Sequence, residues 1–311
     1  MKQRCRMLMV FGTIALLFAA MQCVFAQASS TPAGVPVSMV VTVEGPNGLP
    51  MPDVSRQDVT VYQGRSRAKV TDWVPFQGDR AGLELFILLD DSPNASRGTQ
   101  SEDIRNFIMA QAATTKVGVA YMQIGSPKIV QALTSDHVSA SNAVRPSLAS
   151  LASSASPYFS LVDLMKNWPS GADRREILMI SNGIDHMTSN GNDHEWNGSA
   201  AQYDPYVDSA IEQAQHAGII VFTISTSGVA IYLSRIADET GGGSYYQESG
   251  APVSIAPYLT DSVQRLSRQY LLTFLAKPDK KGGMQSVKIK TEVPHAKLVS
   301  ANKVYVPAAP Q

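Results

Sequence analysis

The alternation of apolar and polar residues changes twice along the chain. Residues 37–78 contain short alternating runs such as VSMVVTV, separated by Gly, Asn and Pro, which is typical of antiparallel hairpins. From Leu83 the apolar runs become nearly continuous, as in LELFILL, which is typical of strands buried on both faces of a parallel sheet. Alternation returns near the end, in SVKIKTEV and AKLVSANKVYV. We therefore predict an N-terminal β segment at 37–78, a central domain at 79–275 and a C-terminal β segment at 276–311.

Strands and helices alternate in the central domain. SEDIRNFIMAQ has apolar residues at helical spacing, REILMISNG is typical of a buried strand, and YVDSAIEQAQHAG is a helical segment that ends at Gly218 before the strand IIVFTIST. This order predicts an α/β fold with a doubly wound, mostly parallel sheet and helices on both faces. The antiparallel segment at 276–311 is expected to pack with the N-terminal strands.

The first residues have the pattern of a secretory signal. Lys2, Arg4 and Arg6 precede the apolar run MLMVFGTIALLFAAM, and the small residues of VFA precede Gln27. We predict a signal peptide at 1–26 and a flexible linker at 27–36, which implies export to the periplasm or the cell exterior. The alternative is an uncleaved N-terminal anchor. Both cysteines lie in this segment, so the mature chain is expected to contain no disulfide.

The charge balance excludes some partner classes. The whole chain has 26 basic and 26 acidic residues, and residues 1–26 contain three of the bases and none of the acids. Cleavage would therefore leave 26 − 3 = 23 bases against 26 acids, a net charge near −3. This balance predicts neither nucleic acid nor an anionic membrane as partner. No second apolar stretch is long enough to span a membrane.

Polar side chains follow two of the predicted buried strands. LLDDSPN places Asp90 and Asp91 at the end of one strand, and MISNGID places Asn182 and Asp185 at the end of another. A run of hydroxyl residues, ASSASPYF, lies between them in the sequence. Ligands of open α/β sheets bind beyond the carboxyl ends of the strands, so these side chains are expected to share one edge.

These motifs, in this order, resemble the von Willebrand factor type A (vWA) domain, and more narrowly the bacterial exported proteins called VWFA-related. The opening VVTVEGPNGLPMPDVSRQDVTVYQG, the passage IADETGGGSYYQ and the closing QYLLTFLA also resemble segments of that family. The resemblance implies a metal-ion-dependent adhesion site, in which Mg²⁺ is held by a D-x-S-x-S loop, a Thr and a D-G turn. It also implies non-covalent recognition of a protein or surface ligand.

Carried over position by position, the resemblance implies a degenerate metal site. Two family positions become amides and the Thr becomes a Ser. The change from Asp to Asn at 182 removes one negative charge near the cation, which weakens or abolishes binding of Mg²⁺ or Ca²⁺. The alternative is that the aspartate caps a turn and the amides satisfy loop backbone groups. The matched residues are Asp90, Ser92, Asn94, Ser156 and Asn182.

A long polar loop at 186–204 is expected at the same edge, with Trp196 and Tyr203 as partner-contacting aromatic residues. Asp91 and Asp185 are predicted to contribute to the same contact. No nucleophile elbow is present and the mature chain lacks cysteine, so we predict a binding or adhesion protein rather than an enzyme. Two alternatives stay open: an enzyme of unrecognised hydrolytic chemistry at this edge, and a structural component of the cell envelope.

Overall fold

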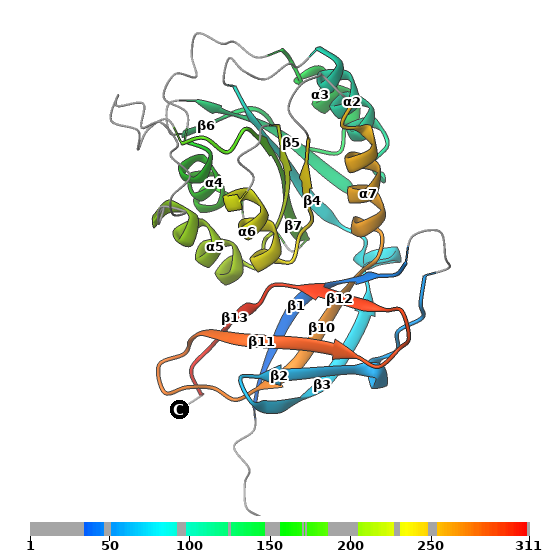
Figure 1. Ribbon diagram of the computed structural model, residues 1–311, viewed down its shortest axis with the longest axis vertical. Coiled ribbons are helices and arrows are strands. Elements are labelled where there is room, and N and C mark those ends of the chain that lie inside the picture. Colours follow the sequence, from blue (N-terminus) through cyan, green and yellow to red (C-terminus); the bar gives the residue numbers. More distant parts are fainter. Residues whose placement is uncertain are drawn as a thin grey trace, which may run out of the picture. The chain divides into compact units, whose positions relative to one another are not determined.

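The secondary-structure elements that the structure describes belong to one unit, Val35–Gln311 (Figure 1). The computed structural model describes residues 34–46, 51–91, 98–123, 126–146, 156–169, 171, 173–185, 205–226, 231–247 and 254–309. Two sheets are present in this part of the chain, one of six strands and one of seven.

The six-stranded sheet has the order β6-β5-β4-β7-β8-β9. Every neighbouring pair is parallel except β5 with β6, which is antiparallel. Its strands are β4 (Leu83–Asp90), β5 (Thr115–Gln123), β6 (Ser126–Thr134), β7 (Arg174–Ser181), β8 (Ile220–Ser225) and β9 (Ser244–Tyr246). Every residue of β4 is buried, because the strand lies in the middle of a sheet that is covered on both sides.

Helices cover both faces of this sheet. Leu85 and Ile87 of β4 pack in one core cluster with α2, α3 and α7, while Phe86 and Leu88 pack in another with α4, α5 and α6. The predicted α/β class is confirmed. The helices are α2 (Gly98–Met109), α3 (His137–Asn142), α4 (Pro157–Lys166), α5 (Pro205–Ala217), α6 (Ile231–Thr240) and α7 (Ala256–Leu266).

The seven-stranded sheet is antiparallel throughout, with the order β12-β1-β10-β3-β2-β11-β13. In β1 the side chains alternate between a buried and a more exposed face, and the buried ones belong to a third core cluster. Short 3₁₀ turns at η1 (Arg56–Asp58) and η2 (Gly78–Arg80) flank the N-terminal strands. The strands are β1 (Val35–Glu44), β2 (Val59–Gln63), β3 (Ser66–Pro75), β10 (Gln269–Ala276), β11 (Gly283–Thr291), β12 (Lys297–Ser300) and β13 (Lys303–Val306).

Strand β10 belongs to the seven-stranded sheet and not to the predicted central domain. The sequence assigned QYLLTFLA to the central domain, which was to end at 275, but β10 pairs with β1 and β3 in the middle of the seven-stranded sheet. Its inward side chains Leu272 and Phe274 are fully buried in the core of that sheet. The boundary therefore lies between Leu266 and Gln269. Segments from before and after the α/β region pair directly, β1 with β12 and β2 with β11.

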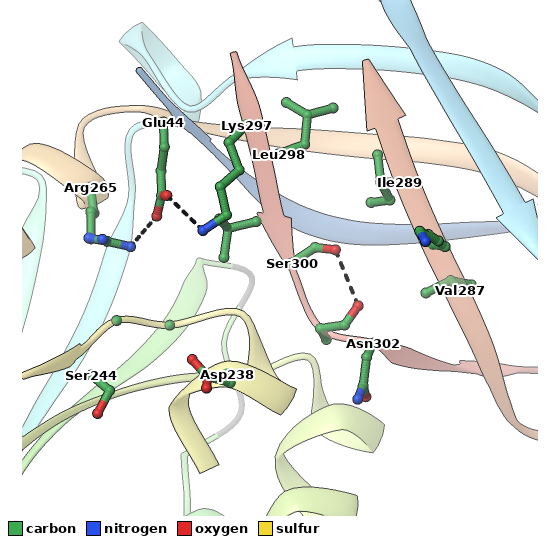
Figure 2. Close-up of a pocket in the computed structure, with 15 residues that line it drawn as sticks. Glu44, Asp238, Ser244, Arg265, Val287, Ile289, Lys297, Leu298, Ser300 and Asn302 are labelled. Atoms are coloured by element: carbon green, nitrogen blue, oxygen red, sulfur yellow. Dashed lines mark hydrogen bonds and ion pairs between the residues drawn. The ribbon is translucent and has the colours of Figure 1, made fainter. Parts of the chain in front are cut away.

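Direct contacts join the helices α6 and α7 to the seven-stranded sheet. Figure 2 shows Arg265 and Lys297 both directed at Glu44, which pairs with each of them; the Lys297 Nζ to Glu44 Oε2 distance is 3.2 Å. Thr240, at the end of α6, forms an isolated antiparallel bridge with Ala301. Within the described residues, a groove of about 430 Å³ lies between α6 and the strands β11 and β12. The ion-paired side chains of Glu44, Arg265 and Lys297 line it.

Candidate functional site

The carboxyl ends of β4 and β7 bring Asp90 and Asn182 together. The two strands are parallel neighbours, paired up to Leu89 and Ile180, so the residues that follow lie at the same edge of the sheet. Oδ2 of Asp90 accepts hydrogen bonds from the Ser181 hydroxyl, at 2.9 Å, and from the Asn182 backbone N–H, at 3.2 Å. Both Asp90 and Asn182 are buried. The Asp90 carboxylate thus ties the ends of two strands together.

The turn after β7 depends on Asn182 and Gly183. The Asn182 side-chain oxygen accepts the backbone N–H of Ile184 at 2.8 Å, which is a local Asx turn. Gly183 has φ +75°, a conformation that side chains with a Cβ rarely adopt. The Tyr158 hydroxyl donates to the Gly183 carbonyl at 2.8 Å and fixes the turn against α4. The side-chain oxygen of Asn182 therefore stabilises this turn.

Ser156 is the N-cap of α4. Its hydroxyl oxygen accepts the backbone N–H of Phe159 at 3.3 Å and donates to Oδ2 of Asp185 at 2.8 Å. A serine followed by Pro157 at the first helical position is a strong helix-start signal, which explains why the helix begins here. Ser156 and Asp185 thus meet at the carboxyl edge, as do Asp90 and Asn182.

The structure corrects the role predicted for Asp91. Its side chain is fully buried and accepts two hydrogen bonds from Arg145, at 3.0 and 2.8 Å, and one from Gln123 at 3.0 Å. The Arg145 guanidinium stacks on the ring of Tyr121, 3.9 Å from its centroid, and the hydrogen bond to Asp91 raises the pKa of Arg145. A buried carboxylate held in this way cannot contact a partner directly, so the role of Asp91 is structural.

Sequence reasoning missed three exposed apolar side chains at the same edge. Phe159 is 36 % exposed, Tyr206 38 % and Ile184 40 %, and the rings of Phe159 and Tyr206 meet edge to face at 5.9 Å. Ile184 precedes Asp185, which is bonded to the cap of the helix that carries Phe159. A signal for the aromatic pair was present in the sequence: α4 begins with Pro-Tyr-Phe and α5 with Pro-Tyr. We call Phe159, Ile184, Asp185 and Tyr206 the rim.

Four predicted site residues lie outside the described residues. These are two residues matched to the metal loop and the two aromatic residues of the polar loop: Ser92, Asn94, Trp196 and Tyr203. Their predicted roles stay predictions.

The described side chains do not fit a divalent cation. The Asn182 oxygen is used by Ile184, the Ser156 hydroxyl is used by Asp185 and Phe159, and Asp90 binds Ser181 and Asn182. Mg²⁺ and Ca²⁺ require several oxygen ligands directed at one point. In the part of the chain that the structure describes, no group of three or more His, Cys, Asp or Glu side chains is placed to hold a metal ion.

Comparisons with known proteins identify likenesses in fold only. No protein-family model matches the chain, and no curated protein matches it. An aerotolerance-related membrane protein from Bacteroides fragilis is 15 % identical, with 60 % of this chain and 98 % of that chain covered and a TM-score of 0.45. The SpRpn10 VWA domain is 14 % identical, with 58 % and 94 % covered and a TM-score of 0.39.

Human Sec24c, a COPII-coat protein, is 8 % identical, with 76 % of this chain and 44 % of that chain covered and a TM-score of 0.39. At these identities the likeness concerns fold and carries no information about ligand or activity. Among the described residues, no helix is both long enough and apolar enough to cross a membrane. The predicted signal segment lies outside those residues.

Proposed function

We propose that this chain is an exported binding protein that recognises a protein partner through the rim, without a bridging metal ion. The observation that carries the proposal is the exposed Phe159–Tyr206 pair, which lies beside the hydrogen-bonded Ser156 and Asp185 at the carboxyl edge. Aromatic side chains that are partly exposed and fixed by a neighbour are the residue type that dominates the binding energy of protein interfaces.

The position of the rim supports this function. In this open α/β sheet the strand order proceeds from β4 to β5 and β6 on one side and from β7 to β8 and β9 on the other. Ligands of such sheets bind outside the carboxyl ends of the strands, where the order reverses, and that point lies between β4 and β7. The rim lies at this end of β7 and at the start of the helices α4 and α5.

A contact without metal follows from how the aspartates are used. Asp90 is buried and binds the end of β7, and Asp91 is buried against Arg145. Asp185 is partly exposed and supplies a carboxylate to the rim. A partner is therefore expected to offer a basic or hydrogen-bond-donating side chain to Asp185 and an apolar surface to the aromatic pair.

The test is capture of a partner from periplasmic or surface extract by immobilised mature protein, quantified by mass spectrometry. The double variant Phe159→Ser with Tyr206→Ser is expected to reduce capture at least about thirtyfold, because such aromatic residues contribute about 1–2 kcal/mol each to an interface and about 1.4 kcal/mol corresponds to a factor of ten. Tyr305→Ser is the matched control: Tyr305 is also 38 % exposed and also contacts one aromatic ring, that of His216, but lies on β13. Equal loss in both variants would refute a role for the rim.

A second arm separates metal-bridged from metal-free recognition. Capture is expected to be the same with Mg²⁺ and with EDTA, and calorimetric titration with Mg²⁺, Mn²⁺ or Ca²⁺ is expected to give no binding tighter than about millimolar. Capture that disappears with EDTA would overturn the metal-free mechanism.

A further inference from the structure

Buried polar atoms without hydrogen-bond partners gather at one place, the amino end of β7. Among the described residues, six buried side-chain nitrogen or oxygen atoms have no hydrogen-bond partner. Five of them belong to four residues: Thr42, Arg174, Glu176 and Gln269. Orphaned buried polar groups are uncommon in folded proteins, so a concentration of them marks a place with unused hydrogen-bonding capacity.

The four residues form one cluster between the two sheets. Arg174 Nη1 donates to Gln269 Oε1 at 2.7 Å and to the carbonyl of Leu266 at 3.1 Å. Its Nε lies 3.8 Å from Glu176 Oε1 and has no hydrogen-bond partner in the described part of the chain. Thr42 and Gln269 are register partners of the β1–β10 pair. The Arg174 side chain is only 7 % exposed, and Glu176 is fully buried.

Arg174 also lines a cavity of about 260 Å³. One wall comes from the seven-stranded sheet and the segment after β3, with Val40, Phe76 and Leu271, and the other comes from Ala214 and Ile220 of the α/β part. The Arg174 guanidinium carbon lies 4.9 Å from the centroid of the Phe76 ring. The cavity thus combines apolar walls with a fixed cation, which is the usual composition of a small-molecule site between layers of a protein.

The charges around the cavity do not balance. Burial raises the pKa of Glu176 to about 7 against the opposing effects of Arg174 and Gln269, so below that pH the glutamate is neutral and does not offset the charge of the guanidinium. The other charged residues that line the cavity are Asp173, whose carboxylate pairs with Lys116 at 3.0 Å, and Lys303. A buried cation without an anion is energetically costly, so the site favours a negatively charged ligand.

We propose that this cavity binds a small monocarboxylate with an apolar tail, whose carboxylate pairs with Arg174 and whose tail packs against Val40, Ile220 and Leu271. Of the four residues in the cluster, Arg174 is the one that lines the cavity, so the ligand carboxylate pairs with its guanidinium, while Glu176 lies behind it, 3.8 Å from Nε. The proposal is independent of the rim, which lies at the opposite end of the parallel strands.

Binding is expected to depend on pH. When Glu176 ionises, its charge neutralises Arg174 and repels a second carboxylate, so affinity falls as pH rises through about 7. Glu176 is the titrating group in this proposal, and the other charged side chains around the site are those of Asp173, Lys116 and Lys303.

Hexanoate is the probe, titrated calorimetrically into the full mature chain at about pH 6 and about pH 8.5. We expect binding at the lower pH that is about tenfold weaker at the higher one, and at least about tenfold weaker binding of acetate, which lacks the tail, and of hexanol, which lacks the charge. Absence of hexanoate binding at both pH values would overturn the proposal.

Variants locate the site. Arg174→Gln is expected to weaken hexanoate at least about tenfold, whereas Arg175→Gln, the adjacent arginine, which donates to the carbonyl of Ala217, leaves affinity within about twofold. Glu176→Gln keeps binding and removes its pH dependence. Because Arg174→Gln also disturbs the junction, Leu271→Phe, which fills the cavity and keeps the cluster, is the second test. Undiminished binding in a folded Arg174→Gln or Leu271→Phe variant would refute the assignment.

Discussion

Two arginine–carboxylate pairs with a fully buried carboxylate lie at opposite ends of the same sheet, and they differ in their hydrogen bonding. At the carboxyl end, Asp91 accepts two hydrogen bonds from Arg145 and a third from Gln123, and Tyr121 covers the guanidinium. At the amino end, Arg174 approaches Glu176 only to 3.8 Å, and both oxygens of Glu176 lack hydrogen-bond partners in the described structure. Burial therefore does not by itself make an ion pair strong.

The pKa shifts of the two arginines have opposite signs for this reason. Hydrogen bonding to Asp91 raises the pKa of Arg145, whereas desolvation lowers the pKa of Arg174. The first pair has the two parallel N–H···O bonds that offset the desolvation cost of a buried ion pair, and the second does not. The first is thus a structural clamp, and the second is a site with unused hydrogen-bonding capacity.

Removing the carboxylate of the clamp is expected to have the largest effect. Asp91→Ala leaves Arg145 partly buried without its partner, which costs about 3–4 kcal/mol of unfolding free energy, measured by urea denaturation. Asp173→Ala is the control, since it breaks the more exposed Lys116 pair and is expected to cost less than about 1 kcal/mol. A loss of unfolding free energy below about 1 kcal/mol for Asp91→Ala would show that the hydrogen bonds between Asp91 and Arg145 do not make this pair a structural clamp.

The amino-end pair is expected to destabilise the protein as pH rises. The pKa of Glu176 is about 7 in the folded chain and 4.5 in the reference state, so its contribution is fully present below about pH 4.5 and is lost between there and about pH 7. The difference corresponds to about 3 kcal/mol, an order-of-magnitude value. Glu176→Gln should lack this fall and become more stable than the wild type at about pH 8.

Urea denaturation of the wild type and of Glu176→Gln across this pH range measures the effect. The contributions of the other titrating groups cancel when the two unfolding free energies are subtracted. Parallel curves for wild type and Glu176→Gln would mean that Glu176 ionises normally in the folded chain.

Loss of a single neutral hydrogen-bonding group is expected to lower the unfolding free energy less than loss of the Asp91 carboxylate. Ser156→Ala removes the N-cap of α4 and the bond to Asp185, and is expected to cost about 1 kcal/mol in thermal or urea denaturation. Ser156→Asn, which keeps a capping oxygen, should recover most of that loss. A loss of unfolding free energy as large as that of Asp91→Ala would indicate that Ser156 stabilises more of the structure than the start of α4.

The smallest stability effect is expected at the rim. Tyr206→Ser and Tyr305→Ser should each change the unfolding free energy by about 0.5 kcal/mol or less, since both side chains are exposed. Only Tyr206→Ser should weaken partner capture. A large loss of stability at Tyr206 would mean that the aromatic pair serves packing.

The sequence predicted those features that depend on local patterns. The continuous apolar run of β4 and the polar residues after β4 and β7 indicated an α/β sheet with Asp90 and Asn182 at its edge, which is where the structure has them. It could not indicate that Asp91 is buried, because the decisive partner, Arg145, lies 54 residues away. The acidic residue within REILMISNG, Glu176, was a visible irregularity in a buried strand, but its neighbours come from β10 and β1.

The α/β region is inserted between β3 and β10, which are hydrogen-bonded neighbours in the seven-stranded sheet, with Pro75 opposite Tyr270. Closing a sheet across so long an insertion carries a large loop-closure entropy unless the inserted part is already compact. We therefore expect the six-stranded sheet to form first during folding and the middle of the other sheet to close afterwards. A polypeptide cut off after Arg268 would still contain every strand of the α/β sheet, but it would lack four of the seven strands of the second sheet, β10, β11, β12 and β13.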